Sequence, residues 1–420
     1  MSLFNGAIAV NDVYTLLFVV FGVLLGGYLL GRITIKGISL GDAGVFIIAL
    51  LVGALFFGTT EQGLVFSPSA TPYDFSDSLS LIEALGLVLF VTSVGYIAAP
   101  NFFGNFKKNF KSYVLLGLVI VLSGGLVAVG CIYVGDWIGY GATIRTREEF
   151  VAMIVGILSG ALTSTPAFAA AKETVAAEYE GLVSVGHGIA YLFGVVGAVL
   201  FVQLVPKLSK ADMAAERAKL AIASTSDKKQ PAGKRFHIDH WGIFGFALAA
   251  IIGVFIGNVK IPLSAAGLDG TCFSLTATGG CLLASLILGH FGHVGPVTIL
   301  PNAQTLKLFR ELGLVLFLVG AGIPGGAEFV AYFDPMYFLY GVVMTVLQLA
   351  VGFLFAKYVL KLSLLNNLGS ITGGRTSTPA LGTLIKVAGT EDVVAAYAAT
   401  YPVALITVVF VSQLIIILFS

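Results

Sequence analysis

Residues 161–168 read ALTSTPAF, and residues 374–381 read GRTSTPAL. Each stretch places hydroxyl side chains and a proline in the middle of an apolar segment, where they favour the end of one helix and the start of another. Inside a membrane an unsatisfied backbone group costs several kcal/mol, so a helix break survives there only where it lines a polar cavity. The two motifs therefore predict two helical hairpins whose tips meet at a polar site within a membrane.

The composition requires such a membrane. The chain of 420 residues is 57% hydrophobic and 11% charged, with a formal net charge of +1. A soluble domain of this size has too little polar surface to cover so much apolar material. Long apolar stretches favour helices over a β-barrel, whose strands alternate every second residue. We therefore expect an all-α polytopic membrane protein embedded in a lipid bilayer, without a nucleic-acid partner.

An enzyme is not expected. The three cysteines, Cys131, Cys272 and Cys281, show neither a metal-ligand spacing nor a disulfide framework. The chain also has no nucleophile signature and no phosphate-binding loop. We expect no cofactor, and sodium at the hairpin tips only under the alternative given below.

Ten apolar runs have the character of membrane spans. They lie near residues 13–31, 43–58, 81–99, 113–134, 183–205, 241–257, 272–289, 311–327, 337–356 and 394–419. Two further apolar stretches, 150–180 and 366–390, contain the TSTP motifs. Each of their arms has about 14 residues, or about 21 Å of helix, which is short of a hydrocarbon core about 30 Å thick. These stretches are predicted to be re-entrant hairpins.

The two halves of the chain are related. LGLVLFVTSVG begins at Leu85 and LGLVLFLVGAG at Leu312, while GISLGDAG at 37–44 pairs with CFSLTATG at 272–279. These matches occur in the same order as the TSTP motifs, which indicates an internal duplication. We expect a first membrane repeat at 1–206, a linker at 207–240 with a short surface helix near 211–223, and a second repeat at 241–420.

The charges predict how the repeats are oriented. Five spans plus one hairpin per half place most of the 23 Lys and Arg residues, including those of the linker, on one side of the membrane. Six spans per half would put the basic linker outside, against the positive-inside rule. An odd number of spans inverts the second repeat, as in many secondary transporters. The linker is then cytoplasmic and both termini are periplasmic.

The tip residues suit a small anion. Thr165 is expected at an N-cap and Pro166 at the first helical position, and Thr378 and Pro379 repeat this arrangement. The second arm of each hairpin then directs its positive dipole end and free amide donors towards the centre of the membrane.

Arg375 stands at the second tip, where a planar carboxylate would be its best partner. The candidate substrate-binding residues are Gly160, Thr163, Ser164, Thr165, Pro166, Gly373, Gly374, Arg375, Thr376, Ser377, Thr378 and Pro379. The alternative interpretation is that the motifs only cap short helices and that Arg375 extends to a membrane surface.

Other polar residues have a stronger structural interpretation. Small residues that could mark a local unwinding beside the tips, but more often serve helix packing, are Thr92, Ser93, Gly320 and Gly322. Lys172 and Lys386 are expected to extend to the membrane interface. His187 could carry a proton, but a helix-packing role is favoured.

With LGLVLFVTSVGYIAAPNFF (residues 85–103), GISLG and the twin TSTPA motifs, the chain resembles the aspartate:alanine exchanger family, whose membrane halves carry the YidE/YbjL duplication. The resemblance covers both halves outside the linker. It implies exchange of small carboxylates such as aspartate, alanine or succinate across a bacterial inner membrane. The family motif positions correspond to Thr163 through Pro166 and Arg375 through Pro379. Many relatives carry a cytoplasmic regulatory domain between the halves, where this chain has only its linker.

Three functional classes remain open at this stage. A carboxylate exchanger is the leading hypothesis, and the resemblance to elevator carriers implies a homodimer by analogy of fold. A sodium- or proton-coupled dicarboxylate symporter is the alternative, because the same hydroxyls and carbonyls at the tips are suitable sodium ligands. A channel is disfavoured, since two closed hairpins leave no continuous polar stripe.

Overall fold

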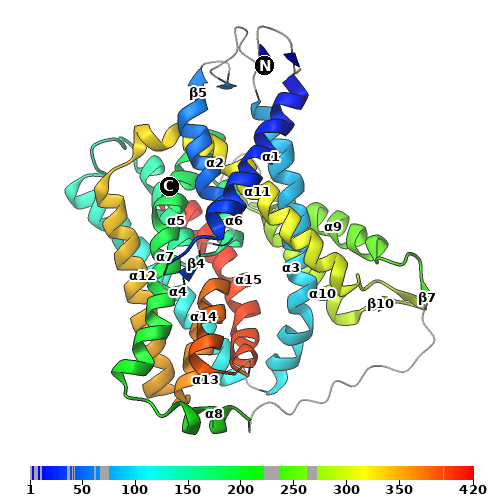
Figure 1. Cartoon of the computed structure of the whole chain (residues 1–420), viewed down its shortest axis with the longest axis vertical. Helices are drawn as coiled ribbons and strands as arrows, with labels where there is room; N and C mark the ends of the chain where they lie inside the picture. Colours follow the sequence, from blue (N-terminus) through cyan, green and yellow to red (C-terminus); the bar gives the residue numbers. More distant parts are fainter. Residues whose placement is uncertain are drawn as a thin grey trace.

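The computed structural model describes residues 2–3, 8–9, 12–35, 38–39, 41, 43–60, 63–66, 75–108, 110–221, 236–262, 272–390 and 392–420. Most of the residues in the ordered elements within these ranges are helical (Figure 1). The protein therefore belongs to the all-α class predicted from its composition.

Seven helices of the described chain have the length and hydropathy to cross a membrane. They are α1 (Asp12–Gly31), α3 (Ser76–Lys108), α4 (Leu115–Ile138), α7 (Glu180–Leu208), α11 (Ala303–Tyr332), α12 (Pro335–Leu354) and α15 (Val393–Phe419). Three shorter apolar helices are α2 (Ala43–Phe56), α9 (Ile243–Gly257) and α10 (Thr276–Phe291). Each predicted apolar run coincides with one of these helices.

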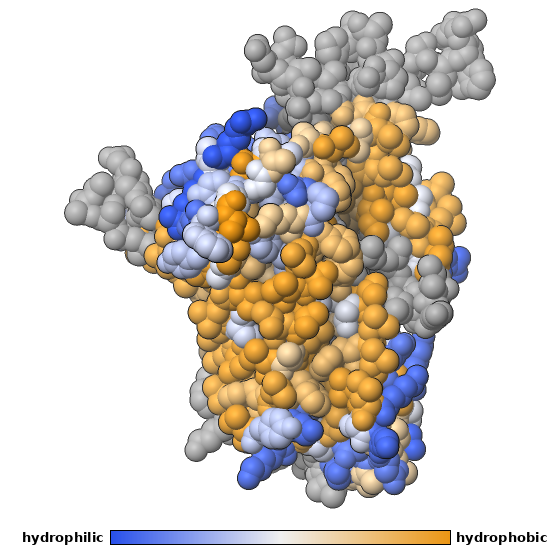
Figure 2. All heavy atoms as spheres, turned by 90° about the vertical axis from the view of Figure 1, so that its left-hand side faces the viewer, coloured by the Kyte–Doolittle hydropathy of each residue, from blue (hydrophilic) through white to orange (hydrophobic). Residues whose placement is uncertain are grey.

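The outer surface has the distribution of a membrane protein. Large apolar side chains point outwards from several helices, among them Trp137, Leu126 and Phe255, which are 87%, 73% and 77% exposed. Figure 2 shows a broad apolar surface with hydrophilic residues gathered towards its two ends. This surface fits contact with lipid, because a soluble monomer rarely exposes an apolar area of this extent.

The strands are short and lie in the connections between helices. They are β1 (Ser2–Leu3), β2 (Ile8–Ala9), β3 (Thr34–Ile35), β4 (Ile38–Ser39), β5 (Phe57–Thr60), β6 (Gly63–Phe66), β7 (Phe236–His237), β8 (Ile261–Pro262), β9 (Cys272–Phe273), β10 (His293–Val294) and β11 (Val297–Thr298). Most pair as two-stranded antiparallel ladders, and β7 adds a parallel strand to β10 and β11.

Both TSTP motifs interrupt a helix. α5 (Arg147–Ala161) is followed by α6 (Thr165–Thr174), and α13 (Leu364–Gly374) is followed by α14 (Thr378–Ala388). We call the residues between these helices the first turn (162–164) and the second turn (375–377). Each turn therefore joins two helices that are too short to cross a membrane alone.

The two interrupted helices begin at opposite ends of α12. Near the N-terminus of α12, the hydroxyl of Tyr337 donates at 2.6 Å to the carbonyl of Tyr140, which lies in the connection from α4 to α5. Near its C-terminus, Asn367 of α13 donates from Nδ2 to the carbonyl of Phe353 at 3.3 Å. Figure 1 accordingly places α5 in the upper part of the molecule and α13 near the bottom. The turns thus approach each other from opposite directions.

The helices form two groups that pack along a shared interface. In the broken-helix group (α4–α7 and α12–α15), α5 packs on α7, α13 on α15, and α4 on both α12 and α15. In the continuous-helix group (α1–α3 and α9–α11), α3 packs on α11 and α10, and α2 on α11 and α1. Contacts of α7 with α11, α15 with α3 and α6 with α10 connect the two groups.

The linker contains the short helix predicted near residues 211–223, which is α8 (Met213–Ala221). Glu216 of α8 accepts a hydrogen bond from the backbone N–H of Leu364, the first residue of α13, at 2.8 Å. The next residue, Arg217, donates to the carbonyl of Ala388 at the end of α14 at 3.0 Å. These charges match the helix dipoles they contact, so α8 stabilises the outer ends of both helices. Residues 222–235 of the linker lie outside the described ranges.

Candidate functional site

The first turn ends α5 with paired backbone hydrogen bonds. The N–H of Thr163 donates to the carbonyl of Gly160 at 2.9 Å, and the N–H of Ser164 donates to the carbonyl of Ser159 at 2.9 Å. Thr163 has φ of 55°. This is the Schellman arrangement, in which the residue with positive φ is usually glycine.

The second turn repeats the same geometry. The N–H of Thr376 donates to the carbonyl of Gly373 at 3.0 Å, that of Ser377 donates to the carbonyl of Thr372 at 3.0 Å, and Thr376 has φ of 53°. Both turns therefore hold a threonine in a backbone conformation that a β-branched residue rarely adopts. A threonine in such a strained position, where a glycine would be free of strain, points to a use for its hydroxyl.

The helix caps lie one residue earlier than the sequence predicts. Ser164, not Thr165, is the N-cap of α6, and its hydroxyl accepts from the N–H of Ala167 at 3.4 Å. Thr165 and Pro166 are the first two helical residues. Ser377 takes the N-cap position of α14 without a side-chain cap bond, and Thr378 and Pro379 follow it, with side chains outside the described part. The prediction was wrong by one residue because the Schellman turn already uses Thr163 and brings Ser164 next to the new helix.

The two turns contact each other directly. Thr163 Oγ1 of the first turn donates to the carbonyl of Arg375 in the second at 3.2 Å. In the other direction, Arg375 Nη2 donates to the carbonyl of Ala161, the last residue of α5. Residues more than two hundred positions apart in sequence thus form one polar centre.

Arg375 is the charged group of this centre and is 0% exposed. Besides Ala161, its guanidinium donates to the carbonyl of Thr345 on α12 at 3.2 Å and to that of Gly194 on α7 at 3.4 Å. Among the described residues, no carboxylate lies within ion-pair distance of Arg375, and its Nε–H has no hydrogen-bond partner. Extension of this side chain to a membrane surface is therefore wrong.

Two hydroxyls of the second turn also lack partners. Within the described part of the chain, the buried atoms Thr376 Oγ1 and Ser377 Oγ make no hydrogen bond. Buried polar atoms are usually paired, so these groups remain available to a ligand.

The tip glycines allow close packing of the helices that carry the turns. A Cβ atom at Gly160 would lie 2.5 Å from the carbonyl oxygen of His187, and one at Gly373 would lie 2.4 Å from that of Tyr397. One at Gly374 would lie 2.5 Å from a methyl carbon of Ile120. These glycines let α5 and α13 lie against α7, α15 and α4, which holds the turns in place.

The secondary candidates lie in continuous helices, so the structure contains no unwinding there. Thr92 and Ser93 are buried in α3, where Ser93 donates to the carbonyl of Leu89 at 2.8 Å. Gly320 and Gly322 lie in α11. A Cβ atom at Gly320 would lie 2.6 Å from Cβ of Glu83, and one at Gly322 would lie 2.6 Å from Cβ of Ala49. Helix packing explains these glycines.

Lys172 is buried, which contradicts the expectation that it extends to the interface. It is 5% exposed, and its Nζ lies 2.7 Å from a carboxylate oxygen of Glu83 and 3.6 Å from one of Glu180. The next residue, Glu173, accepts from the N–H of Thr278 at the start of α10 at 3.1 Å. These contacts join α6 of the broken-helix group to α3 and α10 of the continuous-helix group. Lys386 is exposed.

His187 has the packing role that the sequence favoured. Its Nδ1 lies 2.8 Å from Oγ of Ser159 on α5, and its ring stacks on that of Phe168 at a centroid distance of 4.2 Å. The histidine thereby connects α7 to both helices that flank the first turn.

Sequence reasoning missed two polar residues of α12, Thr345 and Gln348. Both are buried, and Thr345 Oγ1 together with both amide atoms of Gln348 has no partner among the described residues. The available signal was a glutamine in the middle of an apolar helix, since such residues are rare in membrane spans and often functional.

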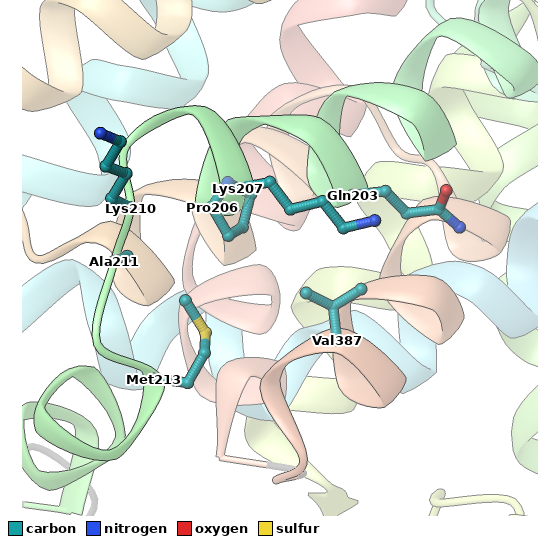
Figure 3. A pocket seen from close by; sticks show the side chains of 7 residues that line it. All are labelled: Gln203, Pro206, Lys207, Lys210, Ala211, Met213 and Val387. Atoms are coloured by element: carbon teal, nitrogen blue, oxygen red, sulfur yellow. The ribbon is translucent and has the colours of Figure 1, made fainter.

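Two surface clefts in the described part of the chain lie away from the turns. One cleft has a volume of about 590 Å³ and lies between the end of α7, the start of the linker and α14. Figure 3 shows Lys207 extending towards Gln203 in this cleft, above Met213 and Val387. A second cleft of about 440 Å³ is lined by residues of α9 and α11 and the segment before α9, such as Trp241 and Phe309. Neither cleft includes a residue of the two turns.

The strained threonine of the second turn gives a direct test of this centre. Thr376→Gly removes the hydroxyl and the positive-φ strain together, so we expect an unfolding midpoint equal to or above that of the wild type. Affinity for the small carboxylate that the sequence predicts as ligand, measured by calorimetry, is expected to fall by about threefold or more because a buried donor is lost. Lys210→Gly is the matched control, since Lys210 has φ of 48° in the linker. Unchanged affinity in Thr376→Gly would show that the hydroxyl of Thr376 does not contact the ligand.

Comparison with known proteins identifies relatives among membrane permeases and transporters. A family model described as a predicted permease membrane region matches residues 18–207 and 245–417. Proteins named as uncharacterized transporters in Bacteroides thetaiotaomicron and Bacteroides fragilis are each 25% identical, and the alignments cover 95% of this chain and 97% of each relative. One from Desulfotalea psychrophila is 25% identical with 97% of both chains covered. The alignments span 551 to 567 positions, so these relatives contain residues with no counterpart in this chain of 420.

Proposed function

The chain belongs to the Asp-Al_Ex family of membrane permeases, and from this premise we propose that it is a secondary transporter that exchanges small carboxylates or acidic amino acids, of the aspartate, alanine or succinate type. The observation that carries the proposal is Arg375, a fully buried guanidinium at the contact between the two turns, without an acidic partner among the described residues. An arginine keeps its charge when buried, so an anion is the natural ligand.

The surroundings of Arg375 favour a carboxylate. The N-termini of α6 and α14 directly follow the first and second turns, and the turns contact each other at Arg375, so the positive ends of both helix dipoles lie at this centre. Thr376 Oγ1 and Ser377 Oγ add unpaired hydroxyls. A planar carboxylate pairs with a guanidinium through two parallel hydrogen bonds and still accepts others from amides and hydroxyls.

The arrangement of helices supports an inverted repeat with two re-entrant hairpins. The two turns share the same backbone bonds, and the helices after them exchange partners, because α6 packs on α15 while α14 packs on α7. The hairpins start at opposite ends of α12. In transporters built this way the substrate binds where the broken helices meet.

We further propose alternating access by an elevator-like shift of the broken-helix group against the continuous-helix group. The interface between these groups runs along α3, α6, α7, α10, α11 and α15. The proposal includes a homodimer in a bacterial inner membrane, with the basic linker in the cytoplasm and both termini in the periplasm, as the distribution of Lys and Arg favours.

A sodium- or proton-coupled dicarboxylate symporter is the alternative. It is favoured by the same unpaired hydroxyls of Thr376 and Ser377, which lie beside turn carbonyls and have the oxygen chemistry of a sodium ligand.

Counterflow in proteoliposomes distinguishes the two. Vesicles loaded with unlabelled succinate should take up labelled aspartate, whereas empty vesicles should not, and replacing sodium with potassium should have little effect. Uptake into empty vesicles that requires a sodium or proton gradient would establish the symporter. Absence of carboxylate flux under every gradient would contradict both functions.

A further inference from the structure

The side-chain amide of Gln348 is fully buried and makes no hydrogen bond with the described residues. It lies one helical turn after Thr345, whose carbonyl accepts a hydrogen bond from Arg375. Gln348 of α12 is 0% exposed, and neither Nε2 nor Oε1 has a partner among the described residues. Gln413 of α15 is buried to the same degree, but its Nε2 donates to the carbonyl of Ser274 at 3.2 Å. The complete lack of partners is therefore a property of the position of Gln348 and not of buried glutamines in this protein generally.

The backbone of α12 places Gln348 beside the polar centre. The carbonyl of Thr345 accepts from Arg375 Nη1 at 3.2 Å. Gln348 follows three residues later, so it lies on the same face of the helix and about 4.5 Å further along the axis. Thr345 Oγ1 is unpaired as well. One face of α12 thus carries a contact to the arginine and unpaired donors and acceptors beyond it.

The opposite helix leaves room for the amide. A Cβ atom at Gly124 of α4 would lie 2.4 Å from Gln348 Nε2 and 3.0 Å from its Cδ, and 3.2 Å from a methyl carbon of Leu158 on α5. The side chain of Gln348 therefore occupies space that only a glycine on α4 provides, close to the helix that leads into the first turn.

Such a position is unfavourable for a glutamine in the absence of a ligand. Burying an amide without hydrogen bonds costs free energy, and an apolar side chain of similar volume avoids that cost. Methionine has nearly the size of glutamine and packs readily in apolar surroundings. The presence of a glutamine at this position indicates a partner that binds during the proposed transport cycle.

We infer that Gln348 is a specificity-determining residue that binds the second polar group of a bifunctional carboxylate, while Arg375 binds the first. The inference rests on the proposed carboxylate function. Nε2 of the amide donates to a carboxylate oxygen and Oε1 accepts from an ammonium, so the residue suits both short dicarboxylates and amino acids. A monocarboxylate with an alkyl tail offers no partner for the amide and binds less tightly for that reason.

The test compares Gln348→Met with the wild type in the purified full-length chain. Calorimetry with succinate, aspartate and butyrate gives the affinities, and thermal unfolding without ligand gives the stability. We expect affinity for succinate and aspartate to fall by at least about tenfold while affinity for butyrate changes by less than about twofold. The unfolding midpoint should be unchanged or higher, because an unpaired buried amide is removed. A merely structural glutamine would give a lower midpoint.

Two further variants complete the test. Gly124→Ala displaces the end of the Gln348 side chain from α4 and is expected to reduce the same preference for bifunctional ligands, which keeps the inference testable if Gln348→Met does not fold. Gln413→Met is the matched control, since it loses an existing hydrogen bond and should lower stability without changing the preference.

The outcomes separate the inference from the proposed function. Wild-type preference for succinate over butyrate in both Gln348→Met and Gly124→Ala would overturn the inference, and it would leave the proposed function intact if Arg375 variants still lose binding. Failure of the wild type to bind any of the three carboxylates would overturn both.

Discussion

Arg375→Ala is expected to weaken binding of a small carboxylate by at least about thirtyfold. The variant removes a charge-assisted contact in a desolvated site, and losses of this kind run to about 2–5 kcal/mol. Arg375→Lys keeps the charge but not the planar pair of donors, so it should recover only part of the affinity. Isothermal calorimetry on purified protein with aspartate and succinate measures both changes.

The structure defines the control for this prediction. Arg375 also donates to the carbonyls of Ala161, Gly194 and Thr345, so Arg375→Ala is expected to lower the unfolding midpoint as well. Ser164→Ala, which removes the cap of α6 in the first turn, should cost about 1 kcal/mol of stability and change affinity much less. Arg375→Ala that folds and binds with wild-type affinity would make the arginine a structural cap of α5 and reject the carboxylate site.

Lys172→Met is expected to destabilise the protein by about 3–5 kcal/mol, because it leaves Glu83 and its acidic neighbours without their cation in a mostly buried place. The side chains of Lys172 and Glu83 are 5% and 16% exposed, and Nζ of Lys172 lies 2.7 Å from Oε1 of Glu83. The double variant Lys172→Met with Glu83→Met should regain most of this loss, since an apolar pair replaces a buried ion pair at little cost. Thermal unfolding in detergent provides the measurement.

The exposed pair of Arg310 and Glu311 is the internal comparison for Lys172. Its side chains are 39% and 41% exposed, so Arg310→Met should cost less than about 1 kcal/mol. Equal effects of Lys172→Met and Arg310→Met would show that the buried pair adds little to stability. The pair of Lys172 and Glu83 joins α6 to α3 across the two helix groups, so the proposed elevator-like shift would break it.

The membrane class and the helix positions follow from local sequence. Apolar runs long enough to span a membrane became helices at the predicted places, because lipid leaves a hydrophobic chain no other way to satisfy its backbone. The TSTP motifs interrupt helices for an equally local reason, since Thr163 and Thr376 close the preceding helix and the following proline suits a helix start.

Contacts between residues that are distant in the sequence could not be predicted from local sequence patterns. The expected N-cap at Thr165 was one residue late, because the Schellman turn that ends α5 extends only to Ser164, which then caps α6. The expected extension of Lys172 to the surface was wrong, because its partner Glu83 lies 89 positions away in the sequence. The residues close to Lys172 in the sequence do not predict this contact.

The sequence by itself determined which segments enter the membrane, where two of them break, and that an arginine stands at one break. These properties depend on hydrophobicity and on hydrogen bonds between residues only a few positions apart. Tertiary structure alone decided that Arg375 contacts the carbonyls of Ala161, Gly194 and Thr345 without an acid among the described residues, and that Gln348 faces Gly124. Such contacts depend on how helices from both halves of the chain pack, and the pattern within any one segment contains no information about the helix that will lie against it.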